Sequence, residues 1–262
     1  MADKRTRWQS WRAARAQALA APDSWLGLVG LFWLDEGANA VGADPAAAVR
    51  LPAGAAHLGR LDCAGSAVVW HPAAGDAVPL RTDVGGAPTV VEHGAFAFFV
   101  IERDGRLAVR LRDRGWAATR PFAGIDAYDY DPAWRIAADW RPLVPPQTIE
   151  VPNVSGDLSP VRVEWQAVFR VGDAEVALLP MRVSAEGVFF VFRDATSGRA
   201  TYGAGRFLDA AVPADGRLVL DFNFAYNPPC AFTPFATCPL PPPENWLPFA
   251  VAAGELRYAD GH

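Results

Sequence analysis

Eight prolines fall within residues 219–248 and restrict the backbone there more than any other feature of the sequence does. Proline fixes φ and lacks an amide donor, so a regular helix or a central strand cannot run through such a segment. We therefore expect extended and turn conformations that hold polar side chains in fixed positions. A rigid segment of this kind is expected to close one end of the fold and to carry the functional site.

Short runs of alternating apolar and polar residues predict that most of the remaining chain is antiparallel β-sheet. The clearest run covers residues 161–170, where every second side chain is apolar, as in a strand with one buried face. The dipeptide Asp104-Gly105 is a strong hairpin signal. Other strands are expected at residues 47–51, 67–70, 77–81, 89–92, 95–102, 106–112, 175–183 and 188–193. Because no helical periodicity separates these runs, the sequence favours a mainly β fold, an antiparallel β-barrel or sandwich.

The N-terminal residues differ, because apolar side chains recur there at helical spacing. Trp8, Trp11 and Leu19 are interleaved with arginines over residues 3–20. This pattern predicts an amphipathic helix that ends before Pro22 and lies outside the β-rich body.

The domain organisation expected from the sequence is a single domain over residues 1–262. Residues 121–140 are less regular, and the proline-rich residues 141–147 are expected to form a stiff connection that is too short and too apolar for a linker between domains. We expect an N-terminal helical segment at about residues 3–34 and a β-rich body at about residues 40–262.

The composition indicates a folded protein and gives no electrostatic reason to expect nucleic acid or an anionic membrane as a partner. Hydrophobic residues make up 51% of the sequence, charged residues make up 20%, and the net charge is -5. The longest apolar run, residues 25–34, is too short to span a bilayer, and no secretory signal pattern is expected at the N-terminus. We therefore expect a cytoplasmic protein.

Candidate functional side chains gather in two segments, residues 194–206 and the proline-rich stretch. Acid and phenol groups in the stretch can serve as general acids or bases. The candidate catalytic residues are Asp221, Tyr226 and Glu244. The candidate ligand-binding residues are Asp194, Thr196, Thr201, Tyr202, Arg206, Asn223, Asn227, Cys230, Cys238 and Asn245. The first hypothesis is a polar pocket at one end of the β-framework that binds a small molecule, with or without turning it over; it predicts that Arg206, Asp221, Asn223, Tyr226, Asn227 and Glu244 converge.

Two other functions remain open on the sequence. In a non-catalytic scaffold or protein-interaction domain, the Asn and Asp side chains would satisfy backbone groups left unpaired by the prolines, and an aromatic patch near Trp246 would be exposed.

In a thiol-dependent enzyme or redox protein, Cys230 and Cys238 would be functional thiols, and they are close enough in sequence to be bridged if the loop folds back. Their spacing is not that of a C-x₂-C zinc site, so we assign no metal ligands, and no cofactor is indicated.

Three strings in the chain are distinctive. They are SWLGLVGLFWLDEGANAVG at residues 24–42, DATSGRATYGAGRFL at residues 194–208 and DFNFAYNPPCAFTPFATCPLPPPENWLPFAVAAGE at residues 221–255. The elements Y-N-P-P-C and C-P-L-P-P-x-E-N are the most specific. With these strings the chain resembles the bacterial, archaeal and fungal family called domain of unknown function 1684.

The resemblance implies membership of the family and no settled activity. It implies the following motif positions: Asp194, Thr196, Gly198, Thr201, Tyr202, Arg206, Asp221, Asn223, Tyr226, Asn227, Cys230, Cys238, Glu244 and Asn245. It also implies a less cationic site in this chain, because a basic residue often stands in the family where Phe224 and Trp246 stand here.

Overall fold

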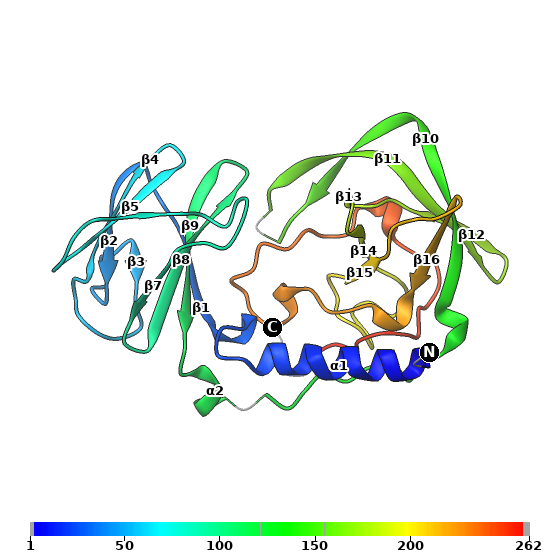
Figure 1. Cartoon of the computed structure of the whole chain (residues 1–262), viewed down its shortest axis with the longest axis horizontal. Coiled ribbons are helices and arrows are strands. Elements are labelled where there is room, and N and C mark those ends of the chain that lie inside the picture. The colour runs from blue at the N-terminus through cyan, green and yellow to red at the C-terminus, as the bar shows by residue number, and fades with distance from the viewer. Residues whose placement is uncertain (1–2, 121, 155, 259–262) are drawn as a thin grey trace. The chain divides into compact units, whose positions relative to one another are not determined.

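The computed structural model describes residues 3–120, 122–154 and 156–258 (Figure 1). The chain divides into two compact units, the first formed by Met1–Ala18 and Ala123–His262 and the second by Leu19–Phe122. Each unit has its own hydrophobic core. The single domain over residues 1–262 stays a prediction.

The predicted N-terminal helix is confirmed as α1 (Lys4–Ala20). Trp8 is buried and its indole Nε1 donates a hydrogen bond to the main-chain oxygen of Asn223 at 3.0 Å, which fastens the helix to the proline-rich segment. The helix ends well before residue 34, where the helical segment was expected to end. Beyond it lie η1 (Trp25–Gly27) and a strand, β1 (Leu28–Trp33). The apolar residues of β1 suit a sheet that is largely buried, which explains the difference.

The second unit contains two sheets that share one core. The first has the order β1-β9-β8-β7, with β7 (Val90–His93), β8 (Phe96–Arg103) and β9 (Arg106–Asp113). The second has the order β3-β2-β4-β5-β6, with β2 (Gly37–Gly42), β3 (Val49–Arg50), β4 (Gly59–Ala64), β5 (Ala67–Pro72) and β6 (Val78–Leu80). A short helix, α2 (Trp116–Thr119), follows. The predicted hairpin at Asp104-Gly105 is confirmed, with φ values of 51° and 74° that suit a tight turn.

The first unit also contains two sheets. One has the order β12-β11-β10-β16, with β10 (Arg135–Pro152), β11 (Leu158–Val171), β12 (Ala174–Leu178) and β16 (Arg217–Asp221). The other has the order β13-β14-β15, with β13 (Arg182–Ser184), β14 (Gly187–Phe192) and β15 (Arg206–Ala210). Both sheets contribute to one core, which includes Ala138, Phe190, Leu208 and Leu220. A short η2 (Pro132–Trp134) precedes β10.

Strand β10 corrects one expectation. Residues 141–147 were expected to be a stiff connection, yet the whole range lies within β10, which begins at Arg135 and so also includes the last residues of the less regular range 121–140. The pairing of β10 with β11 shifts register between Pro142 and Gln147, so the prolines fall where the ladder is interrupted and no amide donor is required.

The proline-rich segment contains only short 3₁₀ turns after β16, in agreement with the prediction that neither a regular helix nor a strand runs through it. The turns are η3 (Phe222–Phe224), η4 (Pro229–Ala231) and η5 (Pro243–Asn245). Phe222 and Leu247 nevertheless belong to the core of the first unit. The segment is therefore part of the packed interior as well as a surface element.

The fold is mainly β, with several antiparallel sheets and an N-terminal helix, as predicted. Among the described strands, only β2 and β3 pair in parallel. A barrel or sandwich, and closure of one end by the proline-rich segment, stay predictions. No helix in the described part of the chain is both long enough and apolar enough to cross a membrane.

Candidate functional site

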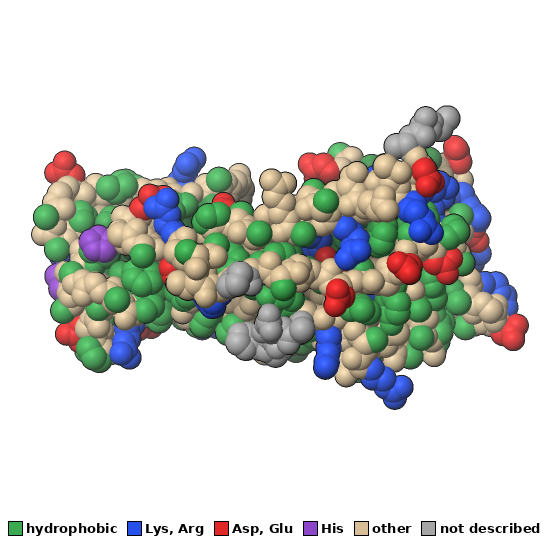
Figure 2. Space-filling model, turned by 90° about the horizontal axis from the view of Figure 1, so that it is seen from below, with side chains coloured by type: hydrophobic (Ala, Val, Ile, Leu, Met, Phe, Trp, Pro, Cys, Tyr) green, Lys and Arg blue, Asp and Glu red, His purple; other side chains and the backbone are tan. Residues whose placement is uncertain are grey.

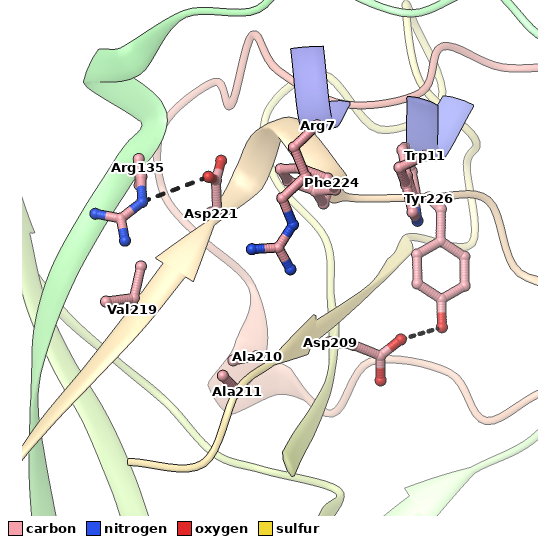
Figure 3. Close-up of a pocket in the computed structure, with 10 residues that line it drawn as sticks. All are labelled: Arg7, Trp11, Arg135, Asp209, Ala210, Ala211, Val219, Asp221, Phe224 and Tyr226. Carbon is pink, nitrogen blue, oxygen red and sulfur yellow. Dashed lines mark hydrogen bonds and ion pairs between the residues drawn. The ribbon is translucent and has the colours of Figure 1, made fainter. Parts of the chain in front are cut away.

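A pocket of about 380 Å³ in the first unit brings together charged and aromatic side chains (Figure 3). This volume lies within the range of about 300–1,000 Å³ that is typical of small-molecule sites. The lining residues are Arg7, Trp11, Arg135, Asp209, Ala210, Ala211, Val219, Asp221, Phe224 and Tyr226. They come from α1, the start of β10, the end of β15, and β16 with the segment that follows it.

Helix α1 supplies two of the lining side chains. Arg7 and Trp11 are four residues apart and therefore project from the same face of the helix. Trp11 packs edge-on against Phe224, with ring centroids 5.2 Å apart, and the Arg7 guanidinium carbon lies 5.8 Å from the Phe224 ring centroid. In Figure 3 the Arg7 side chain extends from the helix into the middle of the pocket.

Tyr226 and Asp209 form a hydrogen-bonded pair on one side of the pocket. Tyr226 exchanges two main-chain hydrogen bonds with Phe207 of β15, which places its side chain beside the end of that strand. Its hydroxyl donates to Asp209 Oδ2 at 2.7 Å. Burial raises the pKa of Tyr226 above its ordinary value, and the hydrogen bond to Asp209 raises it further. At neutral pH the phenol is therefore a neutral donor.

Asp221 and Arg135 occupy the opposite side. The two residues are direct partners in the pairing of β16 with β10, and their side chains form an ion pair with 3.7 Å between Arg135 Nε and Asp221 Oδ2. The other carboxylate oxygen of Asp221 accepts a hydrogen bond from Asn223 Nδ2 at 2.9 Å. The same oxygen accepts a hydrogen bond from the main-chain nitrogen of Asn223, and in this way Asp221 caps η3, the turn that contains Phe224.

The predicted residues of the 194–206 segment form a buried network instead of a pocket wall. Asp194 Oδ2 accepts a hydrogen bond from Arg206 Nη2 at 2.8 Å, and both side chains are fully buried. Asp194 Oδ1 accepts from the hydroxyl of Thr196 and from the main-chain nitrogens of Thr196 and Val251. The Thr196 and Thr201 hydroxyls lie 2.8 Å apart. Burial lowers the pKa of Arg206, an effect that the Asp194 carboxylate opposes.

The three predicted asparagines are buried and bind backbone groups. The Asn223 side chain bonds to both main-chain polar groups of Asp131, at 2.9 and 2.8 Å. Asn245 bonds to both main-chain groups of Leu179 and to the Val191 oxygen. Asn227 donates to the Leu256 oxygen at 2.7 Å. These contacts agree with the alternative in which asparagines satisfy backbone groups beside proline-rich turns.

Tyr202 and two cysteines of the proline-rich segment, Cys230 and Cys238, form a third group. The Tyr202 hydroxyl donates to the Cys230 carbonyl at 2.9 Å, and burial raises the pKa of Tyr202. Neither cysteine is in a disulfide, and both are buried. Within residues 3–120, 122–154 and 156–258, no cluster of three or more His, Cys, Asp or Glu side chains is placed to hold a metal ion.

Residues 120–256 match the family described as "Protein of unknown function (DUF1684)". The chain belongs to this family. The matched residues include every candidate site residue predicted from the sequence, whereas the distinctive string at residues 24–42 lies outside them. A solution NMR structure of an uncharacterized protein from Haloarcula marismortui is 30% identical, over 56% of this chain and 89% of that one, with a TM-score of 0.44. No curated protein matches the chain.

The structure of this DUF1684 protein does not gather all the predicted site residues in one place. Of the six side chains expected to converge, Asp221 and Tyr226 line the pocket, while Arg206, Asn223 and Asn227 are buried in hydrogen-bonded contacts. Glu244 is exposed in η5. Functional roles for all the predicted residues stay predictions.

Of the lining residues, only Asp221 and Tyr226 were predicted as site residues; those missed include Arg7, Trp11, Arg135 and Asp209. Arg7 and Trp11 share a helix face, which was visible in the sequence, but nothing there indicated that the face meets β16. The expectation of a less cationic site than is usual in the family stays a prediction. An arginine stands over each of the two apolar replacements, Arg7 over Phe224 and Arg193 over Trp246, the latter with 4.7 Å between the guanidinium carbon and the ring centroid.

Proposed function

We propose that this protein binds a small organic anion with an apolar or aromatic body in the pocket lined by Arg7, Trp11, Asp209, Asp221, Phe224 and Tyr226. The observation that carries the proposal is the lack of a polar partner for the Arg7 guanidinium among the described residues. Among the residues that the structure describes, no side chain or carbonyl forms a hydrogen bond or an ion pair with the Arg7 guanidinium. It presents its full set of donors to the pocket.

The other charges in the pocket already have partners. Arg135 faces Asp221 across the β10–β16 pair, and Asp209 receives the Tyr226 hydroxyl. Arg7 is therefore the group most able to bind a carboxylate or a phosphate, through the bidentate hydrogen bonds that guanidinium groups favour.

The surroundings of Arg7 favour an anion that also has apolar surface. Trp11 and Phe224 form an aromatic wall beside it, and Val219 adds an aliphatic side chain. A carboxylate retains unfilled acceptor positions when it accepts one hydrogen bond, so Asp209 can also receive a ligand hydroxyl or amine. A compact aromatic or branched acid with one further polar group fits these features.

We attribute selectivity for an anion to local contacts with Arg7. On the face shown in Figure 2, acidic and basic side chains are interspersed among apolar ones over the right-hand part.

Turnover of the ligand is a separate proposal. Asp221 and Tyr226 line the pocket and are placed for roles in positioning or proton transfer, whereas Glu244 lies in η5, outside the lining residues. The raised pKa of Tyr226 suits donation of a proton better than removal of one at neutral pH. The cytoplasmic location likewise stays a prediction.

The test is a thermal-shift screen with matched pairs of an acid and its neutral amide, such as benzoate and benzamide, on the full chain. A ligand present at about one hundred times its dissociation constant stabilises the folded protein by about 2.7 kcal/mol. We expect acids to raise the melting temperature and their amides not to do so. Equal shifts for acids and amides, or none across aromatic and aliphatic acids, would favour the scaffold alternative.

A further inference from the structure

Two thiols of the proline-rich segment lie against each other in the interior of the first unit. Neither Cys230 nor Cys238 is in a disulfide, and both are buried, with exposed fractions of 7% and 5%. The main-chain nitrogen of Cys230 donates a hydrogen bond to Cys238 Sγ at 3.3 Å. The sulfur of one cysteine therefore touches the backbone of the other.

This contact brings the two residues close together. A disulfide requires Cα atoms about 4.4–6.8 Å apart, and the contact between Cys238 Sγ and the main-chain nitrogen of Cys230 is the geometric basis for expecting a link between them. The backbone on both sides is stiffened by Pro228, Pro229 and Pro239, so the two residues are held together instead of meeting by chance.

The surroundings of Cys230 favour its thiolate. A side-chain hydrogen bond from Cys238 lowers the pKa of Cys230, and this effect outweighs burial, which acts in the opposite direction. Cys63, in the second unit, is different: burial raises its pKa, and the nearby acids Glu36 and Asp62 raise it further. Cys63 is thus a built-in reference for an unreactive buried thiol.

We propose that Cys230 and Cys238 form a modification site at which a small peroxide converts the two thiols into an intramolecular disulfide. The Cys230 thiolate attacks one peroxide oxygen, the O–O bond breaks, and Cys230 becomes a sulfenic acid as the other oxygen leaves as water. Cys238 Sγ then attacks the Cys230 sulfur, the S–O bond breaks, and a second water leaves. Two thiols are oxidised and one peroxide is reduced to two waters.

This site is independent of the anion pocket, since neither cysteine lines that pocket. Failure of anion binding would leave the inference untouched, and the reverse also holds. No third His, Cys, Asp or Glu side chain of the described residues joins the pair in a cluster able to hold a metal.

The test uses the full wild-type chain. Reduced protein is exposed to hydrogen peroxide, quenched in denaturant with an alkylating reagent, and mapped by peptide mass spectrometry, with and without later reduction. We expect a peptide pair linked through Cys230 and Cys238, loss of two hydrogen atoms in mass, and recovery of both thiols on reduction. Cys230 should be consumed at least about tenfold faster than Cys63.

Two variants sharpen the result. In Cys238→Ala, the resolving thiol is absent, so Cys230 should accumulate as sulfenic or sulfinic acid; in Cys63→Ala, the Cys230–Cys238 link should form as in the wild type. The proposal is overturned if the wild-type pair stays reduced, if Cys63 reacts as fast as Cys230, or if Cys230 in wild type goes directly to irreversible acids. The wild-type mapping decides the matter even if a variant fails to fold.

Discussion

The Arg206 guanidinium donates a hydrogen bond to the Asp194 carboxylate at 2.8 Å, and neither side chain has any exposed surface. Arg206 also donates to the main-chain oxygens of Val251 and Ala253. The pair thus joins β15, the turn after β14 and residues 251–253 near the C-terminus. A buried pair of this kind fixes a structure, because each partner is costly to leave alone.

Asp194→Asn should strongly destabilise the first unit. The substitution preserves the shape of the side chain but leaves the Arg206 charge uncompensated in the interior, and we expect a loss of about 3–5 kcal/mol in the free energy of unfolding. Urea denaturation followed by tryptophan fluorescence measures it. The double variant Asp194→Leu/Arg206→Met should lose less than the sum of the two single changes. A single-variant loss below about 1 kcal/mol would mean that the pair behaves like an exposed one.

Asn245→Asp should destabilise the protein although it changes only one group. The Asn245 amide donates to the oxygens of Leu179 and Val191, and a carboxylate there would face both oxygens without a donor. We expect a loss of about 1–3 kcal/mol or more in the free energy of unfolding. Glu244→Gln, at the exposed neighbour, is the control and should stay within about 0.5 kcal/mol of the wild type. Equal effects at the two positions would contradict the structural role of Asn245.

Stability should fall at alkaline pH as the tyrosines titrate. Burial raises the pKa values of Tyr202 and Tyr226, so the folded state holds their protons where the unfolded state releases them. Their contribution to the free energy of unfolding is therefore complete below about pH 10, the pKa of tyrosine in the unfolded state. It is lost as the pH rises from there through the pKa values of the folded state. The free energy of unfolding, measured from pH 8 to 11, should fall less steeply with pH in the double variant Tyr202→Phe/Tyr226→Phe than in the wild type. Identical slopes would contradict the assignment.

Local patterns in the sequence predicted the elements that depend on local chemistry. The strand at residues 161–170 lies within β11, and the Asp104-Gly105 turn joins β8 to β9. Helix α1 follows from its apolar spacing. These features are set by side-chain period and turn chemistry, which short windows contain.

The parts that the sequence did not reveal depend on tertiary contacts. Strand β10 contains Pro142, which reads as a breaker unless the register shift beside it is known. The site was predicted from polar residues around prolines, but such residues serve backbone groups as readily as ligands, as Asn223 and Asn245 do. Arg7 could be placed in the pocket only after the docking of α1 was known.

The most direct test of the proposed function is calorimetric titration of benzoate into three proteins: the wild type, Arg7→Gln and Lys4→Gln. Lys4 lies on the same helix, is exposed, and is not among the pocket residues, so Lys4→Gln removes the same charge without touching the site. We expect Arg7→Gln to raise the dissociation constant about tenfold or more, which corresponds to loss of one charge-assisted hydrogen bond, and Lys4→Gln to bind as the wild type does. Equal binding by Arg7→Gln and Lys4→Gln, or no binding to the wild type, would contradict it.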